Sequence, residues 1–175
     1  MDWLAGGDRT ELATERIYAA AAASAALHGL DRLNIDDIAA RVGCSRATVY
    51  RHVGGKRQLR DGVLARSIAR IGAEVAAAVD GLDGEDRIAR AILGSLETIR
   101  TDPVAAGLLA GAPVARSLLD SPRLAGTATA LAGLPVDDAV APEWVVRVVL
   151  ALLYWPMPRD DEEAVVRRFV AAAFA

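Results

Sequence analysis

Residues 34 to 52 read NIDDIAARVGCSRATVYRH, and this stretch determines how the rest of the chain is interpreted. Asn34 is a good N-cap for the eight residues that follow, whose apolar side chains recur on one helical face. Gly43 then stands where a tight turn needs a positive φ, and Ser45 can cap a second helix. A short amphipathic helix, a glycine turn and a Ser-capped second helix have the spacing of a helix-turn-helix motif.

The second helix of this motif, expected over residues 45–52, carries side chains that suit a nucleic acid. Its outward positions hold donors for phosphates and base edges, and none of them is acidic: Arg46, Thr48, Tyr50, Arg51 and His52. Its apolar side is expected to consist of Ala47, Val49 and Val53. We interpret it as a DNA recognition helix. The alternative is an ordinary pair of glycine-linked helices in a bundle.

The charges of the chain are segregated. The net charge is −3, but residues 1–60 sum to +2 and residues 61–175 to −5, and residues 41–60 hold six cations and no acid. A polyanion would select such a segment. Lys56 and Arg57 also open the next helix, where the helix dipole favours acids. A bound phosphate would remove this conflict, although two solvated side chains would explain it as well.

Composition argues against several other classes of protein. The single cysteine, Cys44, excludes an internal disulfide, and the lack of an apolar leader favours a cytoplasmic protein. The longest apolar run, Val148 to Trp155, is far short of the roughly 18 to 20 residues of a membrane span. We find no catalytic, metal or cofactor motif, so an enzyme is not expected. Cys44 fits a small buried side chain better than a redox sensor.

Helical patterns continue to the end of the chain, with no strand pattern, so the fold class is all-α. We expect a loose arm over residues 1–9, a DNA-binding head over 10–60 that contains the helix-turn-helix, and a further helical bundle over 61–175, to which the family resemblance given below assigns ligand binding and dimerisation. The first helix should run from Thr10 to Gly29. Later helices are expected to begin at or just after these residues: Lys56, Gly84, Pro103, Pro113, Pro122, Pro142 and Asp160.

The segment from Ile17 to Leu64 resembles the N-terminal DNA-binding domain of the TetR family of transcriptional regulators. The resemblance is carried by Ile17, Ala20, Ala21, Gly29, Ile38, Ala39, Gly43, Ser45, Thr48, Val49, Tyr50, His52, Lys56 and Leu59. It implies a three-helix head, a long connecting helix, and a helical body that binds a ligand and dimerises. It also implies a homodimeric repressor that binds a palindromic operator in double-stranded DNA and is relieved by its ligand.

The resemblance also implies roles for individual residues. The positions that usually grip the DNA backbone are Thr48, Tyr50, His52 and Lys56, those that usually meet base edges are Arg46 and Ala47, and Arg51 can do either. With Ser45, these form the predicted DNA-binding set. The chain departs from the usual family pattern at Val53 (commonly Phe), Cys44 (commonly Val) and Arg57 (commonly Glu), and Arg57 adds positive charge.

The C-terminal part gives weaker predictions. Its two last helices have surplus apolar surface, and the family resemblance implies a dimer interface there, which we assign to Trp144, Val148, Leu152, Val165 and Phe169. The alternative is that the aromatic residues fill a monomer core. Residues 61–140 contain no aromatic residue, His, Cys or Met, so a pocket there would be aliphatic and suit a small apolar effector. Stacking would come from Trp144, Tyr154 or Trp155. The arginines that could meet an acidic ligand are Arg100, Arg116 and Arg147, although such residues more often lie on solvated faces or pair locally.

A second function class remains open at this point. The chain could be an all-helical small-molecule-binding or scaffolding protein that has such a head without binding DNA sequence-specifically.

Overall fold

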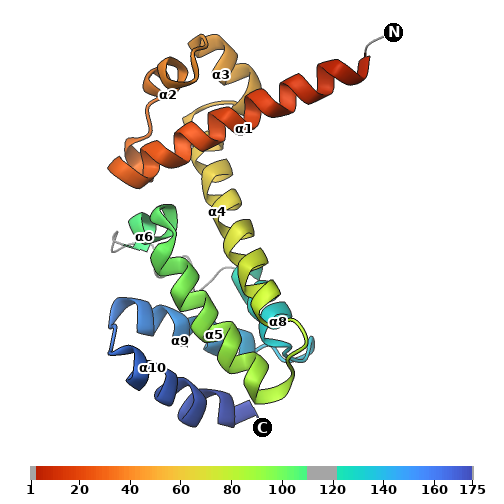
Figure 1. Ribbon diagram of the computed structural model, residues 1–175, viewed down its shortest axis with the longest axis vertical. Coiled ribbons are helices and arrows are strands. Elements are labelled where there is room, and N and C mark those ends of the chain that lie inside the picture. Colours follow the sequence, from red (N-terminus) through yellow and green to blue (C-terminus); the bar gives the residue numbers. More distant parts are fainter. Residues whose placement is uncertain (1–2, 110–121, 175) are drawn as a thin grey trace. The chain divides into compact units, whose positions relative to one another are not determined.

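The computed structural model describes residues 3–109 and 122–174, and every regular element in these ranges is a helix (Figure 1). The predicted all-α fold is confirmed. The chain forms two compact units: one contains residues up to Ile68 together with Pro103–Leu108, and the other contains Ala69–Asp102 together with Leu109–Ala175. We call them the head and the body. Each is described by itself below.

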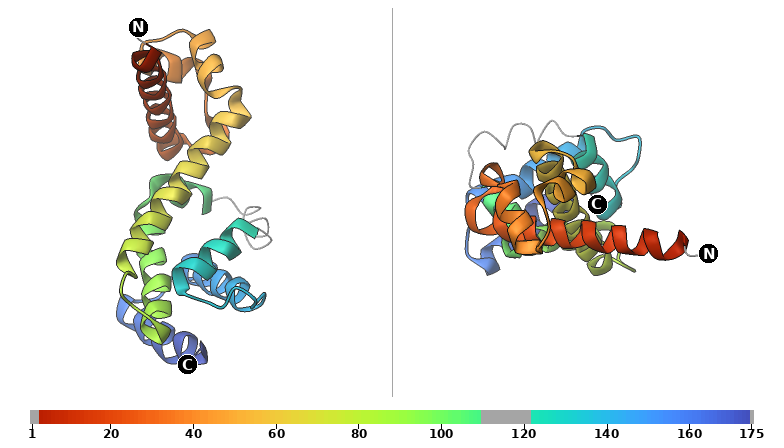
Figure 2. Two further views of the ribbon diagram at one scale, coloured as in Figure 1. Left: turned by 90° about the vertical axis from the view of Figure 1, so that its right-hand side faces the viewer. Right: turned by 90° about the horizontal axis from the view of Figure 1, so that it is seen from above.

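The head contains α1 (Trp3–His28), a 3-10 turn η1 (Leu30–Arg32), α2 (Ile35–Val42), α3 (Arg46–Val53), the first part of α4 (Lys56–Ala78) and most of α6 (Pro103–Leu109). Within it, α1 packs against both α2 and α3 (Figure 2). The bounds of α2 and α3 agree with the predicted motif. The start of α6 at Pro103 was predicted as well.

The beginning of α1 differs from the expectation. Residues 3–9, expected as a loose arm, are helical, and α1 continues without a break through Thr10. Gly6 and Gly7 lower helix propensity by only about 1 kcal/mol each, so they weaken a helix without terminating it. The predicted end is correct: Gly29 follows the last helical residue with φ of 85°, and its N–H donates to the Ala25 carbonyl at 2.8 Å.

A continuous apolar cluster fills the head. Its fully buried members come from every helix of the unit and include Ile17, Ala21, Leu33, Ile38, Val49, Leu59, Val63 and Val104. The small side chains of α1 permit close approach of the neighbouring helices. Cys44 is partly buried against this cluster, in agreement with the packing role that we expected.

The body contains the second part of α4, α5 (Gly84–Thr101), α8 (Pro122–Ala132), α9 (Ala141–Tyr154) and α10 (Arg159–Val165). The last helix continues as a π-helical segment η2 (Val166–Val170) and a 3-10 segment η3 (Ala171–Phe174). α5 packs against α8, α9, η2 and η3. The helix expected near Pro113 lies outside the described residues.

The core of the body is also a single apolar cluster. Its most deeply buried members include Val75, Val79, Ala89, Ile92, Leu96, Val166 and Ala171. Two acids are buried beside it, and each has an arginine partner: Asp102 pairs with Arg70, and Glu162 pairs with Arg100. Buried carboxylates need such partners because an unpaired charge in the interior is very costly.

Candidate nucleic-acid interface

The helix-turn-helix is set by three local features that fix the end of one helix and the start of the next. The Asn34 side chain accepts a hydrogen bond from the Asp36 N–H at 2.9 Å and caps α2. Gly43 has φ of 74° and ψ of 37°, and its N–H bonds to carbonyls in the last turn of α2. The Ser45 Oγ accepts from the Thr48 N–H at 3.1 Å and caps α3. All three predicted roles are confirmed.

The recognition helix α3 has one buried side and one exposed side. Val49 and Val53 lie in the core of the head, at 0% and 6% exposure. The exposed side is formed by Arg46, Ala47, Tyr50 and Arg51. The placement of Ala47 on the apolar side was therefore wrong: it precedes Val49 by two residues, about 200° around the helix, so its methyl group faces outward.

Thr48 and Ser45 form part of the cap. Their hydroxyl oxygens are 2.9 Å apart, which holds the half-buried Thr48 side chain against the first turn of α3. One of the two hydroxyls uses its hydrogen in this bond and the other keeps its own, and the first turn of a helix presents unpaired backbone N–H groups. This end of α3 therefore offers donors to an anion.

Arg46 is held on the exposed side by a neighbour from each helix of the motif. Its Nη1 is 3.2 Å from Asp36 Oδ2 on α2, and its Nη2 donates to the Tyr50 hydroxyl at 3.3 Å. The guanidinium carbon lies 5.5 Å from the centre of the Tyr50 ring. The hydrogen bond to Tyr50 and the charge of Asp36 raise the pKa of Arg46 above its usual range, so the side chain is a permanent cation.

His52 links α3 to α1. Its Nδ1 is 3.1 Å from Thr14 Oγ1, and the Thr14 hydroxyl donates to the Thr10 carbonyl at 2.8 Å. The Thr14 oxygen and the ring nitrogen share one hydrogen bond, whose direction depends on the tautomer of His52. The bond leaves Nε2 as the ring nitrogen for a further partner, and it orients the half-buried ring.

The start of α4 has more partners than the sequence suggested. The Lys56 Nζ donates to the Asp31 carbonyl at 2.8 Å, and Arg60 pairs with the Asp31 carboxylate at 3.1 Å. The Gln58 side chain accepts from the Gly55 N–H at 3.1 Å, as in a capping box. The basic start of α4 is thus compensated partly by η1 and by this cap, and Arg57 remains exposed.

An open hollow lies between η1, α2, α3 and the start of α4. It has a volume of about 370 Å³, and its lining residues are Arg32, Leu33, Asn34, Ile35, Asp36, Arg46, Tyr50 and Lys56. Most of these side chains are polar, and cations outnumber the acid. The hollow brings Arg46, Tyr50 and Lys56 of the predicted set to one surface; Ala47 and Arg51 lie elsewhere on the exposed side of α3.

Three residues of this surface were missed by the sequence analysis. Gln58 had a usable signal, since Gly55-x-x-Gln is the spacing of a capping box. Asp36 had no signal of its own, because its partner Arg46 lies ten positions away on another helix. Thr14 carries no local signal, because it is 38 residues from His52.

In the body, the arginines that were expected to meet a ligand have other partners. Arg100 donates to both carboxylate oxygens of buried Glu162, at 2.9 and 2.7 Å, and to the Leu152 carbonyl at 3.0 Å. The hydrogen bond with Glu162 raises the pKa of Arg100. Arg147 pairs with Glu143 one turn away at 3.0 Å. Arg100 and Arg147 thus pair locally, the alternative that the sequence left open, and Arg116 lies outside the described residues.

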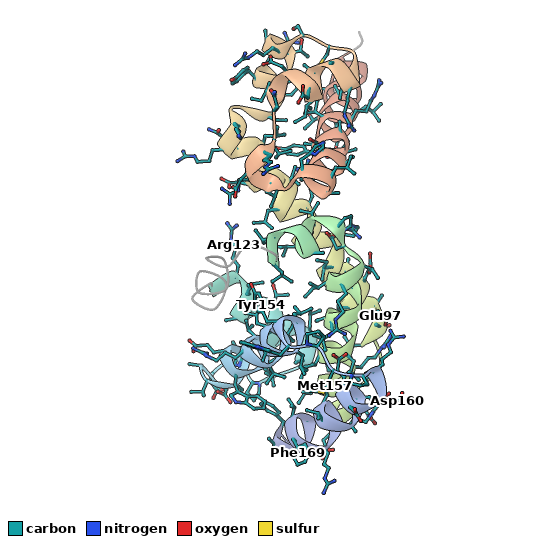
Figure 3. The ribbon with its side chains drawn as sticks, turned by 90° about the vertical axis from the view of Figure 1, so that its left-hand side faces the viewer. Glu97, Arg123, Tyr154, Met157, Asp160 and Phe169 are labelled. Atoms are coloured by element: carbon teal, nitrogen blue, oxygen red, sulfur yellow. The ribbon has the colours of Figure 1, made fainter. Side chains whose placement is uncertain are left out.

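The residues predicted for a dimer interface differ in exposure. Phe169 is 63% exposed on the last helical segment (Figure 3), and Trp144 is 39% exposed and packs against Phe174 with ring centres 6.1 Å apart. Val148 and Val165 are half-buried. Leu152 is only 6% exposed and belongs to the core of its own chain, so its assignment to an interface was wrong. It lies one turn beyond Val148, where the packing of α9 against the body's core buries it.

Tyr154, near the end of α9, has a buried hydroxyl that makes no hydrogen bond within the part of the chain that the structure describes (Figure 3). Its ring contacts Trp155, which is itself 75% exposed.

The helices of the described residues include none with the length and apolar character of a membrane span.

Comparison with known proteins agrees with the fold and with the surface described above. The family model for bacterial regulatory proteins of the tetR family matches residues 17–63, which include the whole helix-turn-helix. The chain is 33% identical over 180 residues to the uncharacterized HTH-type transcriptional regulator Rv1255c of Mycobacterium tuberculosis, an alignment that covers 97% of this chain and 88% of the relative.

Two solved structures are similar in fold. A TetR-family transcriptional regulator from Rhodococcus sp. superimposes with a TM-score of 0.60 at 18% identity and covers 93% of this chain and 98% of its own. The transcriptional repressor QsdR of R. erythropolis, also from the TetR family, has a TM-score of 0.51 at 20% identity and covers 89% and 93%.

An all-helical protein with a basic helix-turn-helix surface of this kind is a DNA-binding transcriptional regulator. The chain belongs to the TetR family of such regulators.

Proposed function

We propose that the protein is a homodimeric, ligand-responsive repressor that binds a palindromic operator through α3. The observation that carries the proposal is the exposed side of α3, where Arg46, Tyr50 and Arg51 stand without an acid on the same helix. A single short helix contacts only a few base pairs, so a two-fold dimer that contacts two half-sites would provide the required length of sequence.

The residues of the surface are assigned roles by reach and chemistry. Arg46 and Ala47, at the start of α3, would contact base edges, since Arg pairs with guanine O6 and N7 and a methyl group packs on thymine. Ser45, Thr48, Tyr50, His52 and Lys56 would contact the DNA backbone. Arg51 is exposed and long enough for either. We assign residues 10–60 to DNA binding and 61–175 to regulation and dimerisation.

We assign dimerisation to the exposed apolar surface of the last helices, which includes Trp144, Val148, Val165 and Phe169. Phe169 supports this most directly, because a phenyl ring at 63% exposure is costly in water and favourable in an interface. Sedimentation of Phe169→Glu should show dissociation to monomers. Val136→Glu is the matched control, since Val136 is 94% exposed on a loop outside this surface. Dimers that survive Phe169→Glu would count against the assignment.

A small and largely apolar effector is proposed for the body. The described parts of the body provide mostly aliphatic side chains, and the Tyr154 hydroxyl would gain a hydrogen-bond partner from a bound molecule. As a regulator that binds DNA, the protein would act in the cytoplasm.

The test of the proposed function is a shift assay with the DNA upstream of the protein's own gene. A repressor of this kind should give saturable binding that survives a large excess of unrelated duplex. The alternative, a helical small-molecule-binding or scaffolding protein, predicts only association that salt abolishes, because non-specific binding is almost entirely electrostatic.

A further inference from the structure

We propose that Asp36 determines base specificity by orienting Arg46. The carboxylate on α2 would hold the guanidinium on α3 in the plane in which it meets one guanine. This inference rests on the proposed function, because it requires α3 to lie in the major groove of DNA.

Two side chains, Asp36 and Tyr50, hold the Arg46 guanidinium between them, and we call this arrangement the clamp. Asp36 Oδ2 contacts Nη1 at 3.2 Å from α2, and the Tyr50 hydroxyl accepts from Nη2 at 3.3 Å from the next turn of α3. A guanidinium has five N–H donors in one plane, and these contacts occupy only two of them. The remaining donors can still form the paired hydrogen bonds that guanine O6 and N7 accept. The clamp therefore fixes the plane of the fork while leaving donors free for a base.

The Asp36–Arg46 ion pair contributes little to the free energy of folding. Both side chains are 59% exposed, and exposed ion pairs have small effects on stability. Its consequence lies in binding, because an unrestrained Arg loses rotamer freedom when it is fixed on a base. An Arg that is already held by Asp36 and Tyr50 loses less.

The same carboxylate opposes contact with DNA in general. A negative charge at this surface repels phosphates of any sequence, so Asp36 should weaken non-specific binding while it strengthens one base contact. Asp37, the next residue, is also exposed and makes no ion pair within the described residues. Removing the Asp37 charge therefore changes the field at the surface without releasing Arg46, and this makes Asp37→Asn the matched control.

The experiment uses the full chain and a library of duplexes with a randomised central segment, from which bound sequences are selected and counted. The wild type is compared with Asp36→Asn, Asp37→Asn and Arg46→Ala. Asp36→Asn should lower the preference at one base pair by about threefold or more, and Arg46→Ala should relax the same pair by about 5- to 150-fold. Asp37→Asn should change that preference by less than about twofold. Both Asn variants should bind bulk calf-thymus DNA more tightly than the wild type.

Further controls separate this inference from the proposed function. Asp36→Glu keeps the charge and the acceptor, so it should restore part of the preference, which a merely structural role would not predict. If Asp36→Asn and Asp37→Asn select with equal preference, the inference is wrong while the proposed function stands. If the wild type itself enriches no sequence, the proposed function fails and the inference fails with it.

Discussion

Gly62, in the middle of the head's part of α4, should lose stability when it receives a methyl group, because Tyr18 occupies the space that the methyl group needs. A Cβ at this position would lie 2.5 Å from the Tyr18 hydroxyl oxygen and 2.6 Å from its Cζ, and nearer still to Cε1. The ring is half-buried on α1, and the guanidinium carbon of Arg66 lies 3.5 Å from its centre. Arg66 in turn donates to Glu15 at 2.6 Å, a bond that lowers the pKa of Glu15. Gly62→Ala must displace the ring from this arrangement.

The size of the effect follows from two opposing contributions. Ala in place of a helical Gly stabilises a helix by about 1 kcal/mol. Forcing an extra methyl group into a packed site costs about 1 to 3 kcal/mol. This cost includes the loss of the cation–π contact between Arg66 and Tyr18. Gly62→Ala should therefore lower the free energy of unfolding by about 1 kcal/mol. In a Tyr18→Ala background the obstructing atoms are gone, and the same substitution should raise it by up to about 1 kcal/mol.

The assay is a double-mutant cycle in urea, measured on the full chain and combined with hydrogen exchange of α1 peptides, so that the change is assigned to the head. The reversal of sign is the critical result, because no general effect of Ala on α4 produces it. If Gly62→Ala has the same sign in both backgrounds, the packing of Tyr18 over Gly62 is not what requires the glycine.

Three further predictions concern the turn, the phosphate contact and the start of α9. In thermal melts, Gly43→Ala should lower the free energy of unfolding by about 1 to 2 kcal/mol, because a φ of 74° is strained for any residue with a Cβ. The control Gly72→Ala, at a helical site with nothing near the added methyl group, should not lower it. Lys56→Ala should make the dependence of log affinity on log salt shallower by about one unit in anisotropy titrations with an operator duplex, and an unchanged slope would argue against a phosphate contact. Asp138 accepts from two backbone N–H groups at the start of α9, at 2.9 Å each, which lowers its pKa. This stabilisation is present above the pKa of an unfolded Asp, about 3.9, and disappears as pH falls through the lower folded value. The stability advantage of the wild type over Asp138→Asn should thus be constant near neutral pH and shrink in acid, whereas an advantage that persists below pH 2 would contradict it.

The features that the sequence predicted correctly are those that depend on neighbours within a few residues. Asn34, Gly43 and Ser45 each act through a bond to a residue at most four positions away, and their chemistry defines the motif without reference to the rest of the fold. The start of α1 was predicted wrongly because a local signal, Gly6-Gly7, was interpreted without its flanking residues. Two glycines look like a local boundary, but a helix continues through them when the flanking residues favour it.

The contacts that the sequence could not predict join residues far apart in the chain. Thr14 and His52 are 38 positions apart, and Arg100 and Glu162 are 62. Burial of Leu152 was misjudged because α9 is apolar on more than one side, so its sequence does not show which side faces the core. Only the packing of α8 and α5 against α9 decides it.

The charge of the recognition surface illustrates how the fold changes a conclusion drawn from a sequence window. Residues 41–60 contain no acid, yet folding brings acids to their cations: Asp36 reaches Arg46, and the Asp31 carboxylate reaches Arg60. The surface is therefore less positive than the window suggests, and some of its long side chains are already held in place. A surface with this balance gains less from general attraction to phosphates and more from contacts of defined geometry. Such a balance favours selective over non-specific binding. The acids weaken attachment to every duplex, while the arginines that they hold are kept in position to contact one particular sequence.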